Sequence, residues 1–170
     1  MLNTAVHITA KLKACKRPGW ESIEVRHTGT SGLGLFATAF IPGPHKKNKA
    51  IAANNFCDYI GVPVNYMICN NSHYICSIGS LSVNSIHKDS CFGRYANDAL
   101  VLYKINAKIM LSPIHSAKFV MSPLRDIQPG DDIYVSYGLD FWRNCKTDDP
   151  VLQNKIKIYI ARMERAGYAN

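Results

Sequence analysis

The chain has 170 residues, and its 20 Lys and Arg against 12 Asp and Glu give a formal net charge of +8. This length fits one domain with a substantial core, and a hydrophobic fraction of 47% is ordinary for a soluble globular protein. No apolar run approaches the ~20 residues that span a bilayer, and the first residues lack the apolar segment of a secretory signal. We therefore expect a nuclear or cytoplasmic protein without membrane contact, and we interpret the acid-free residues 1–20 as a basic flank rather than an organelle-targeting signal.

The positive charge predicts attraction to a polyanion or an acidic surface such as nucleic acid or chromatin, although a merely soluble basic protein has the same composition. The six Cys are scattered, with no pair at Cys-x-x-Cys spacing, and the six His also lack ligand spacing. We predict no structural metal and no disulfides, and we expect reduced, mostly buried thiols.

The first half of the chain contains short β-type segments separated by turns. Ile23 to His27 alternates apolar and polar residues, as a half-buried strand does. The segment from Thr28 to Ala37 contains three glycines, which predict either a tight loop whose backbone approaches a ligand or a plain hairpin. A strand, a glycine break and a second strand are predicted over Asn55 to Val64, one or two more strands over Tyr66 to Ile78, and a polar loop over Ser80 to Asp89.

The middle of the chain contains the stretch Gly93-Arg94-Tyr95-Ala96-Asn97-Asp98-Ala99. The amide of Asn97 could bind a ligand through one acceptor and two donors, but such residues also cap turns. Two further strands are predicted at Asn106 to Met110 and Lys118 to Met121.

The last third starts with a turn at Pro129-Gly130, and the strand-forming run Ile133 to Tyr137 follows it. Gly138 ends this run, and Phe141 and Trp142 come directly after, so the segment predicts either the lining of a small pocket or an ordinary buried strand and turn. Beyond it, an N-cap candidate at Asp149, a proline at the first turn and apolar residues at helical spacing predict a helix from Asp149 to Gly167.

Four of these stretches, in this order along the chain, resemble the motifs of the SET-domain protein lysine methyltransferases. They cover most of the chain, and they are Gly32-Leu33-Gly34-Leu35-Phe36-Ala37, Asp58-Tyr59-Ile60-Gly61, Gly93 to Ala99, and Arg125 to Ile133 followed by Tyr137-Gly138. The resemblance implies a mainly β fold of small curved sheets, in which the middle and final motifs cross in a pseudoknot-like arrangement. It also implies a basic flank at 1–20, a catalytic domain at 21–145 and, at 146–170, a C-terminal helix that closes the site.

By this resemblance the cofactor is S-adenosylmethionine. The backbone of Gly32, Leu33 and Gly34 would contact its methionine part, Asn97 would contact its charged groups, and Phe141 or Trp142 would cover the adenine, with Trp142 slightly favoured. The other expected cofactor contacts are Arg94, Tyr95, Asp98 and Tyr137. Asp98 stands where the family has His, a position that serves the adenine largely through its backbone.

The resemblance also implies that Tyr137 is the catalytic tyrosine and that Tyr59 forms a wall of a substrate channel, which Tyr134, Val135 and Tyr103 could also line. Val135 stands where relatives often have Phe or Tyr, and its smaller side chain predicts room for di- or trimethylation. Only Cys145 remains of the three zinc-binding cysteines that many relatives carry after the final motif.

The expected substrate is a lysine in a histone tail or another basic protein segment, with possible nucleosome or nucleic-acid contact through the basic surface. Two alternatives stay open. One is a SET fold that has lost turnover and recruits partners through Lys46, Lys47 and Lys49, and the other is an unrelated β-rich basic domain.

Overall fold

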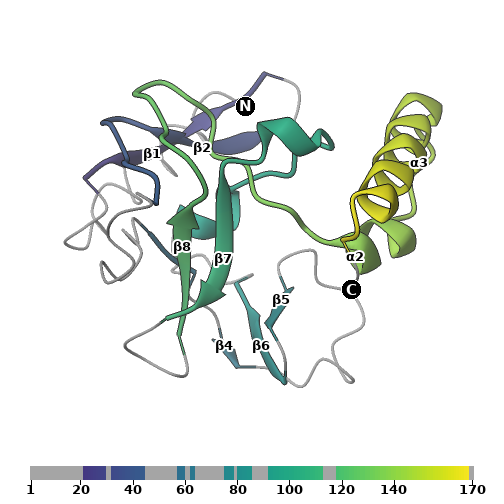
Figure 1. Ribbon diagram of the computed structural model, residues 1–170, viewed down its shortest axis with the longest axis horizontal. Coiled ribbons are helices and arrows are strands. Elements are labelled where there is room, and N and C mark those ends of the chain that lie inside the picture. Colours follow the sequence, from purple (N-terminus) through teal and green to yellow (C-terminus); the bar gives the residue numbers. More distant parts are fainter. Residues whose placement is uncertain are drawn as a thin grey trace.

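The computed structural model describes residues 21–29, 32–44, 57–59, 62–63, 75–78, 80–85, 92–112 and 118–168, of which residues 58, 59, 62 and 63 are described by their backbone alone. Small strand pairs form one side of the molecule, and two helices, α2 (Leu139–Asn144) and α3 (Pro150–Arg165), form the other (Figure 1). None of the described helices is long and apolar enough to cross a membrane.

The strands form three small antiparallel sheets, in agreement with the predicted mainly β architecture. The first is the hairpin of β1 and β2, the second has the order β3-β8-β7, and the third has the order β4-β6-β5. The strand bounds are β1 Ile23–His27, β2 Leu33–Ala37, β3 Cys57–Tyr59, β4 Val62–Pro63, β5 Ile75–Ile78, β6 Leu81–Asn84, β7 Ala107–Leu111 and β8 Phe119–Pro123. Two short 3-10 helices, η1 (Phe92–Tyr95) and η2 (Leu102–Lys104), lie between β6 and β7 in the sequence.

The turn between β1 and β2 is a tight one. Its Thr28 N–H donates to the carbonyl of Gly32 over 2.9 Å, and Gly29 and Gly32 have φ angles of 80° and 79°. Residues that carry a side chain rarely adopt such φ angles, which explains why glycine occupies both positions. The glycine-rich segment is therefore a hairpin, and its third glycine, Gly34, lies inside strand β2.

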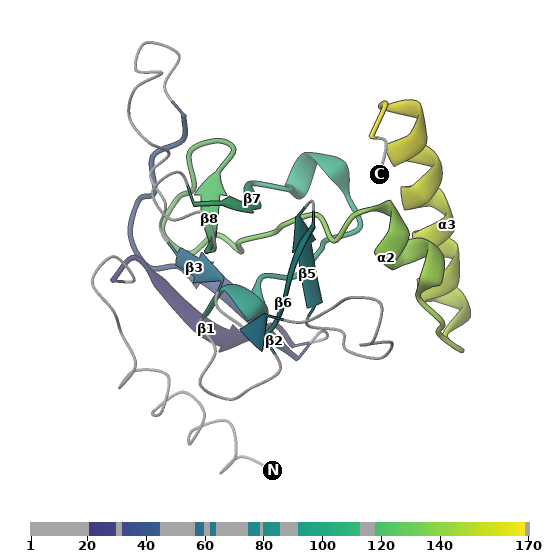
Figure 2. The same cartoon turned by 90° about the horizontal axis from the view of Figure 1, so that it is seen from below.

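The segment after β8 crosses the molecule to reach α2, and Figure 2 shows its green trace running from the β7–β8 side to the helices. On one side it bonds to β2, where Ile133 N–H donates to Leu35 O over 2.8 Å. On the other side Val135 N–H donates to Asn97 O over 3.0 Å, and Asn97 and Tyr134 form a parallel bridge. The final motif thus lies between β2 and the middle motif, which is the predicted crossing.

The core has two parts. The larger cluster joins the sheets to the crossing segment and includes Ile23, Leu35, Phe119 and Ile133, all at most 1% exposed. The smaller cluster joins α2 to α3 and consists of the buried residues Leu139, Trp142, Ile156, Tyr159 and Met163. Residues on each side of Gly138 therefore belong to different clusters.

Several predicted elements are confirmed. Helix α3 begins at Pro150, and the carboxylate of its N-cap Asp149 accepts from Val151 N–H over 2.8 Å. It ends before Gly167, whose φ of 73° is typical of a helix stop. The predicted strands at Ile23, Asn106 and Lys118 match β1, β7 and β8 to within two residues.

Two predictions were wrong. The segment Ser80 to Asp89, expected as a polar loop, contains the central strand β6, whose Ser82 and Val83 are buried between β4 and β5. The run Ile133 to Tyr137 forms one isolated bridge, at Tyr134, and no strand, because its backbone bonds go to β2, to Asn97 and to the start of β7 in place of a single partner strand. Helix α2 was not predicted at all.

Some predictions fall outside the described residues: the basic flank 1–20, the lysines of 45–49, Gly61, and residues 64–74. In the part of the chain that is described, Cys57, Cys76 and Cys145 are free thiols, and no group of three potential metal ligands occurs.

Candidate functional site

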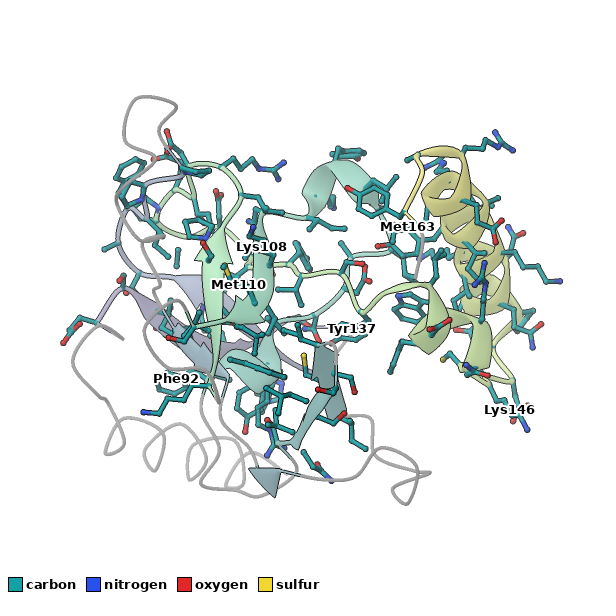
Figure 3. The ribbon with its side chains drawn as sticks, turned by 60° about the horizontal axis from the view of Figure 1, so that its bottom comes forward. Phe92, Lys108, Met110, Tyr137, Lys146 and Met163 are labelled. Carbon is teal, nitrogen blue, oxygen red and sulfur yellow. The ribbon has the colours of Figure 1, made fainter. Side chains whose placement is uncertain are left out.

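Tyr137 lies between the sheets and helix α2 (Figure 3). Its hydroxyl donates to the carbonyl of Ala96 over 3.1 Å, and its backbone N–H donates to Asp98 Oδ2 over 2.9 Å. The residue is 36% exposed, so the ring is anchored at its hydroxyl and still reachable from solvent. Its hydroxyl therefore lies beside the middle motif, 41 residues earlier in the chain.

Three aromatic rings cluster where the crossing segment becomes helix α2. Gly138, with a φ of 85°, turns the chain there, and Phe141 and Trp142 follow in the first turns of α2. The ring of Trp142 stacks on Tyr137 with a centroid distance of 5.8 Å, and Phe141 meets Tyr137 edge-on at 4.8 Å. Trp142 is 9% exposed and belongs to the smaller core cluster, so Phe141 is the more accessible ring.

Asn97 joins the hairpin to the crossing segment. Its amide Nδ2 donates to the carbonyl of Leu33 over 3.0 Å, and its backbone carbonyl accepts from Val135 N–H over 3.0 Å. A Cβ atom at Gly34 would lie 3.3 Å from Asn97 Nδ2, so the amide packs closely against the β2 backbone. Residues from three predicted motifs are thus in direct contact here.

The Asp98 carboxylate accepts hydrogen bonds from several elements. Its Oδ1 accepts from Leu100 N–H over 2.9 Å. Its Oδ2 accepts from Tyr137 N–H over 2.9 Å, from Trp142 Nε1 over 2.9 Å and from the hydroxyl of Tyr159 over 3.3 Å. Asp98 therefore bonds through its side chain, a function that the sequence did not indicate.

Asn106 is another residue that sequence reasoning missed. It is 5% exposed, and its amide bonds the crossing segment at two points, with Nδ2 donating to Asp132 O over 2.8 Å and Oδ1 accepting from Tyr134 N–H over 2.9 Å. A buried amide with both ends paired holds a backbone segment in register. An asparagine at the start of a predicted strand was the only available signal.

The remaining predicted residues lie in varied surroundings. Val135 is 1% exposed and packs in the larger core cluster, so its effect on the number of methyl groups stays a prediction. The ring of Tyr103 is 74% exposed on η2. The backbone of Tyr59 pairs with Phe119 in the sheet, and its side chain lies outside the described part of the chain.

Arg94 and Tyr95 lie on η1, where the guanidinium of Arg94 lies 5.0 Å from the centroid of the Tyr95 ring. Arg94 also donates to the carbonyl of Ser85 over 3.0 Å, which joins η1 to the end of β6. These contacts show Arg94 supporting the fold, and its predicted role toward a cofactor stays a prediction.

Burial raises the pKa of two tyrosines near the crossing segment. The pKa of Tyr159 rises to about 12, mainly through burial and, in addition, through the nearby Asp98 carboxylate, while a bond with Ser136 acts in the opposite direction. The pKa of Tyr134 is raised by burial and then by Asp132. Both phenols are neutral at physiological pH, so the Tyr159 hydroxyl keeps the proton that it donates to Asp98.

No family model matches the sequence, and no curated protein matches it either. Among solved structures, the methyltransferase domain of human PR domain-containing protein 2 is similar with a TM-score of 0.58 and 15% sequence identity over 85% of this chain and 89% of that one. The SET domain of the RIZ1 tumor suppressor is similar with a TM-score of 0.56 and 15% identity over 95% and 90% of the two chains. The chain therefore has the fold of SET domains, as its ordered motifs predicted.

Proposed function

We propose that this protein transfers methyl groups from S-adenosylmethionine to the side-chain amine of a lysine in another protein. The observation that carries the proposal is the meeting of three motifs at one place. Tyr137 bonds to Ala96, the neighbouring Asn97 bonds to Leu33 of the glycine hairpin, and both bonds lie where the final motif crosses the middle one. The fold shared with methyltransferase and SET domains supports the same activity.

The residues around this crossing have the chemistry that S-adenosylmethionine requires. The half-buried ring of Phe141 could offer an apolar surface for an adenine. At Gly32 no atom lies within 4 Å of where a Cβ would be, so a ligand could approach that backbone closely. Asn97 keeps its amide oxygen and a second N–H after bonding to Leu33, which suits the ammonium and carboxylate of the methionine part.

The bound cofactor would supply a methyl group on a positively charged sulfur, ready for in-line displacement. The protein then has to align the lysine amine and keep it unprotonated. A lysine pKa is about 10.4 in water, and a low-dielectric environment lowers it by disfavouring the ammonium. The oxygens of the Tyr137 hydroxyl and the Ala96 carbonyl, 3.1 Å apart, could both accept N–H bonds from the amine, which would fix its orientation and leave its lone pair for the methyl group.

The net charge of +8 supports a substrate that is presented on a polyanion, and histone tails on nucleosomes fit this description. Four cationic side chains of α3, those of Lys155, Lys157, Arg162 and Arg165, are exposed and could contact such a surface. Lysines in other basic proteins fit the same chemistry.

The test is methyl transfer from radiolabelled S-adenosylmethionine to core histones and nucleosomes, together with calorimetric measurement of cofactor binding. Tyr137→Phe removes the proposed active-site hydroxyl. We expect it to lower kcat by about 100-fold or more while the protein still binds the cofactor, because the hydroxyl acts on the reacting groups. Tyr168→Phe is the matched control, since it removes a hydroxyl from a ring that is 52% exposed at the end of α3.

The outcomes separate the competing functions. Cofactor binding without transfer to any substrate would favour an inactive binding module. No cofactor binding would contradict the proposal altogether. Equal transfer by the wild-type and Tyr137→Phe proteins would exclude the catalytic role of Tyr137.

A further inference from the structure

The carboxylate of Asp98 connects four parts of the molecule. Its donors are the backbone of Leu100 just after the middle motif, the backbone of Tyr137 in the crossing segment, the indole of Trp142 in α2, and the hydroxyl of Tyr159 in α3. Three of these donors lie 39, 44 and 61 residues away in the sequence. A single side chain therefore joins the middle motif to the whole C-terminal part of the chain.

The two carboxylate oxygens have different tasks. Oδ1 bonds to Leu100 N–H, two residues further along, where Leu100 has a φ of 54°. This local turn sets the orientation of the carboxylate. Oδ2, held in place by that turn, accepts all three distant donors, and the three distances lie between 2.9 and 3.3 Å.

This pattern requires a carboxylate. A carboxylate has about four lone-pair positions, two on each oxygen, so it can take Leu100 N–H on Oδ1 while the three other donors share the two positions of Oδ2, with Tyr159 the most distant of them at 3.3 Å. An Asn amide has only one oxygen, so its N–H₂ group would face either Leu100 N–H or the three distant donors, and the N–H groups among these cannot accept a hydrogen bond. A neutral imidazole has one acceptor nitrogen. Asp98 is therefore matched to these donors in a way that neither Asn nor the family's His could be.

Through Asp98, Tyr159 of α3 is also connected to Tyr137, the residue that we place at the reaction centre. Tyr159 is 1% exposed, and its ring meets Trp142 edge-on at 6.5 Å, while Trp142 stacks on Tyr137. The backbone of Tyr137, two aromatic rings and α3 thus converge on one oxygen. If that oxygen moved, the backbone of Tyr137 would move with it, because its N–H donates to the same oxygen.

We propose that Asp98 is a positioning residue that anchors the C-terminal helices to the backbone of Tyr137 and thereby aims the Tyr137 hydroxyl. The inference rests on the proposed function and adds a residue to it. It also explains why Asp stands at a position where the SET-domain family has His, because the carboxylate connects Tyr159 of α3 to Tyr137. The replacement is then a substitute anchor rather than a sign of lost activity.

The anchor can be tested without measuring activity. Nitrogen-15 NMR of the full chain shows one indole N–H signal for each of its two tryptophans, and Trp142→Phe assigns the signal of Trp142. Asp98→Asn should move the Trp142 signal, because the indole loses its charged acceptor. Asp148→Asn, the same chemical change at an exposed acid, should leave both signals in place.

The positioning role is tested by the kinetics of the same variants. We expect Asp98→Asn to lower kcat by about 10- to 100-fold while the KM for S-adenosylmethionine changes by less than about threefold, since small misplacement of a reacting group affects the chemical step most. Tyr159→Phe removes one of the three donors to Oδ2 and should lower kcat by a smaller factor. Asp148→Asn should retain wild-type kinetics.

Each outcome decides a separate point. An unmoved Trp142 signal in Asp98→Asn would disprove the anchor. A moved signal with unchanged kcat would show that the anchor exists but does not position Tyr137, which also overturns the inference. If the wild-type chain transfers no methyl group to any substrate, the proposed function fails and the positioning role with it, while the indole signal still decides whether Asp98 holds the helices.

Discussion

At the residue scale, position 34 requires glycine because neighbouring atoms leave no room for a side chain, and not because of its backbone angle. A Cβ atom there would lie 2.5 Å from Thr28 Cγ2, 3.2 Å from Phe36 Cε2 and 3.3 Å from Asn97 Nδ2. The first distance is shorter than side chains tolerate, and the branched side chain of Thr28 has little freedom to move away. The need for glycine at this position therefore comes first from close packing against Thr28 in the β1–β2 turn and, to a smaller degree, from Phe36 and Asn97.

We predict that Gly34→Ala destabilises the protein by about 1–3 kcal/mol, as overpacking in a filled site does, and weakens binding of S-adenosylmethionine by displacing the Asn97 amide. Chemical denaturation and calorimetry measure the two effects. The control is Gly29→Ala, where φ is 80° but no atom lies within 4 Å of the added Cβ. It should cost about 1–2 kcal/mol through backbone strain alone and leave cofactor affinity unchanged. Equal loss of affinity in both variants would contradict the role of Gly34.

The two aromatic residues after Gly138, Phe141 and Trp142, differ in how far they are exposed. The sequence slightly favoured Trp142 as the adenine cover, yet its indole is 9% exposed and committed to Asp98 and Tyr137. Phe141 presents the more accessible ring on the same helix. Adjacent residues on a helix point about 100° apart, so only the docking of α2 decides which ring faces the core.

At the scale of elements, α3 is a helix whose ends are specified locally. The Asp149 carboxylate accepts from the N–H groups of Val151 and Leu152 over 2.8 and 3.3 Å, and Pro150 occupies the first helical position. These are among the donors that a helix leaves unpaired at its N-terminus. The start of α3 was predictable for this reason.

We predict that Asp149→Ala destabilises the protein by about 1 kcal/mol, because these backbone donors lose their acceptor. Asp149→Ser, which keeps an N-cap oxygen, should recover most of the loss. Thermal unfolding followed by circular dichroism compares the two variants with the wild-type protein. If the alanine variant melts at the wild-type temperature, the cap does not contribute to the stability of the folded chain.

The crossing segment shows the opposite case. Ile133 to Tyr137 has strand-forming composition, but its backbone hydrogen bonds go to several partners in turn, first Leu35, then Asn106 and Ala107, then Asn97 and finally the Asp98 carboxylate. A ladder needs one partner strand along its whole length, whereas this segment changes partner every one or two residues. Composition indicated strand-forming residues, and it contained no information about the partners.

At the scale of the whole molecule, Val135 belongs to the larger core cluster and Leu139 to the smaller one, and Asp98 bonds to Tyr137 between them and to Trp142 and Tyr159 of the smaller cluster. Tyr159 is the link on the side of α3, and its pKa is raised to about 12 by burial and by Asp98. In the unfolded chain a tyrosine has a pKa of about 10. Between these two values the unfolded chain releases a proton that the folded protein retains, so unfolding becomes more favourable as the pH rises.

We therefore predict that the contribution of Tyr159 to stability is fully present below pH 10 and is lost as the pH rises toward 12, by a total on the order of 2 kcal/mol. Urea denaturation at a series of pH values measures it as the difference between the wild-type and Tyr159→Phe proteins, which cancels the titration of the other groups. That difference should be largest near neutral pH and shrink above pH 10. A constant difference over this range would show that the Tyr159 hydroxyl is not buried in the folded protein.

The sequence by itself determined the local features of this protein: the β1 strand, the α3 helix with both its ends, and four motifs whose order indicated the SET fold. Local signals suffice there, because hairpin turns and helix caps are made by residues within a few positions of one another. Only the tertiary structure decided that Ser82 and Val83 lie in a central strand, that Asn106 holds the crossing segment, and that the Asp98 side chain joins α2 and α3 to Tyr137. The partners of the Asn106 side chain and the distant partners of Asp98 are 26 to 61 residues away in the sequence, and a carboxylate accepts any donor that the fold brings within reach, so the sequence shows the acid without showing what it binds.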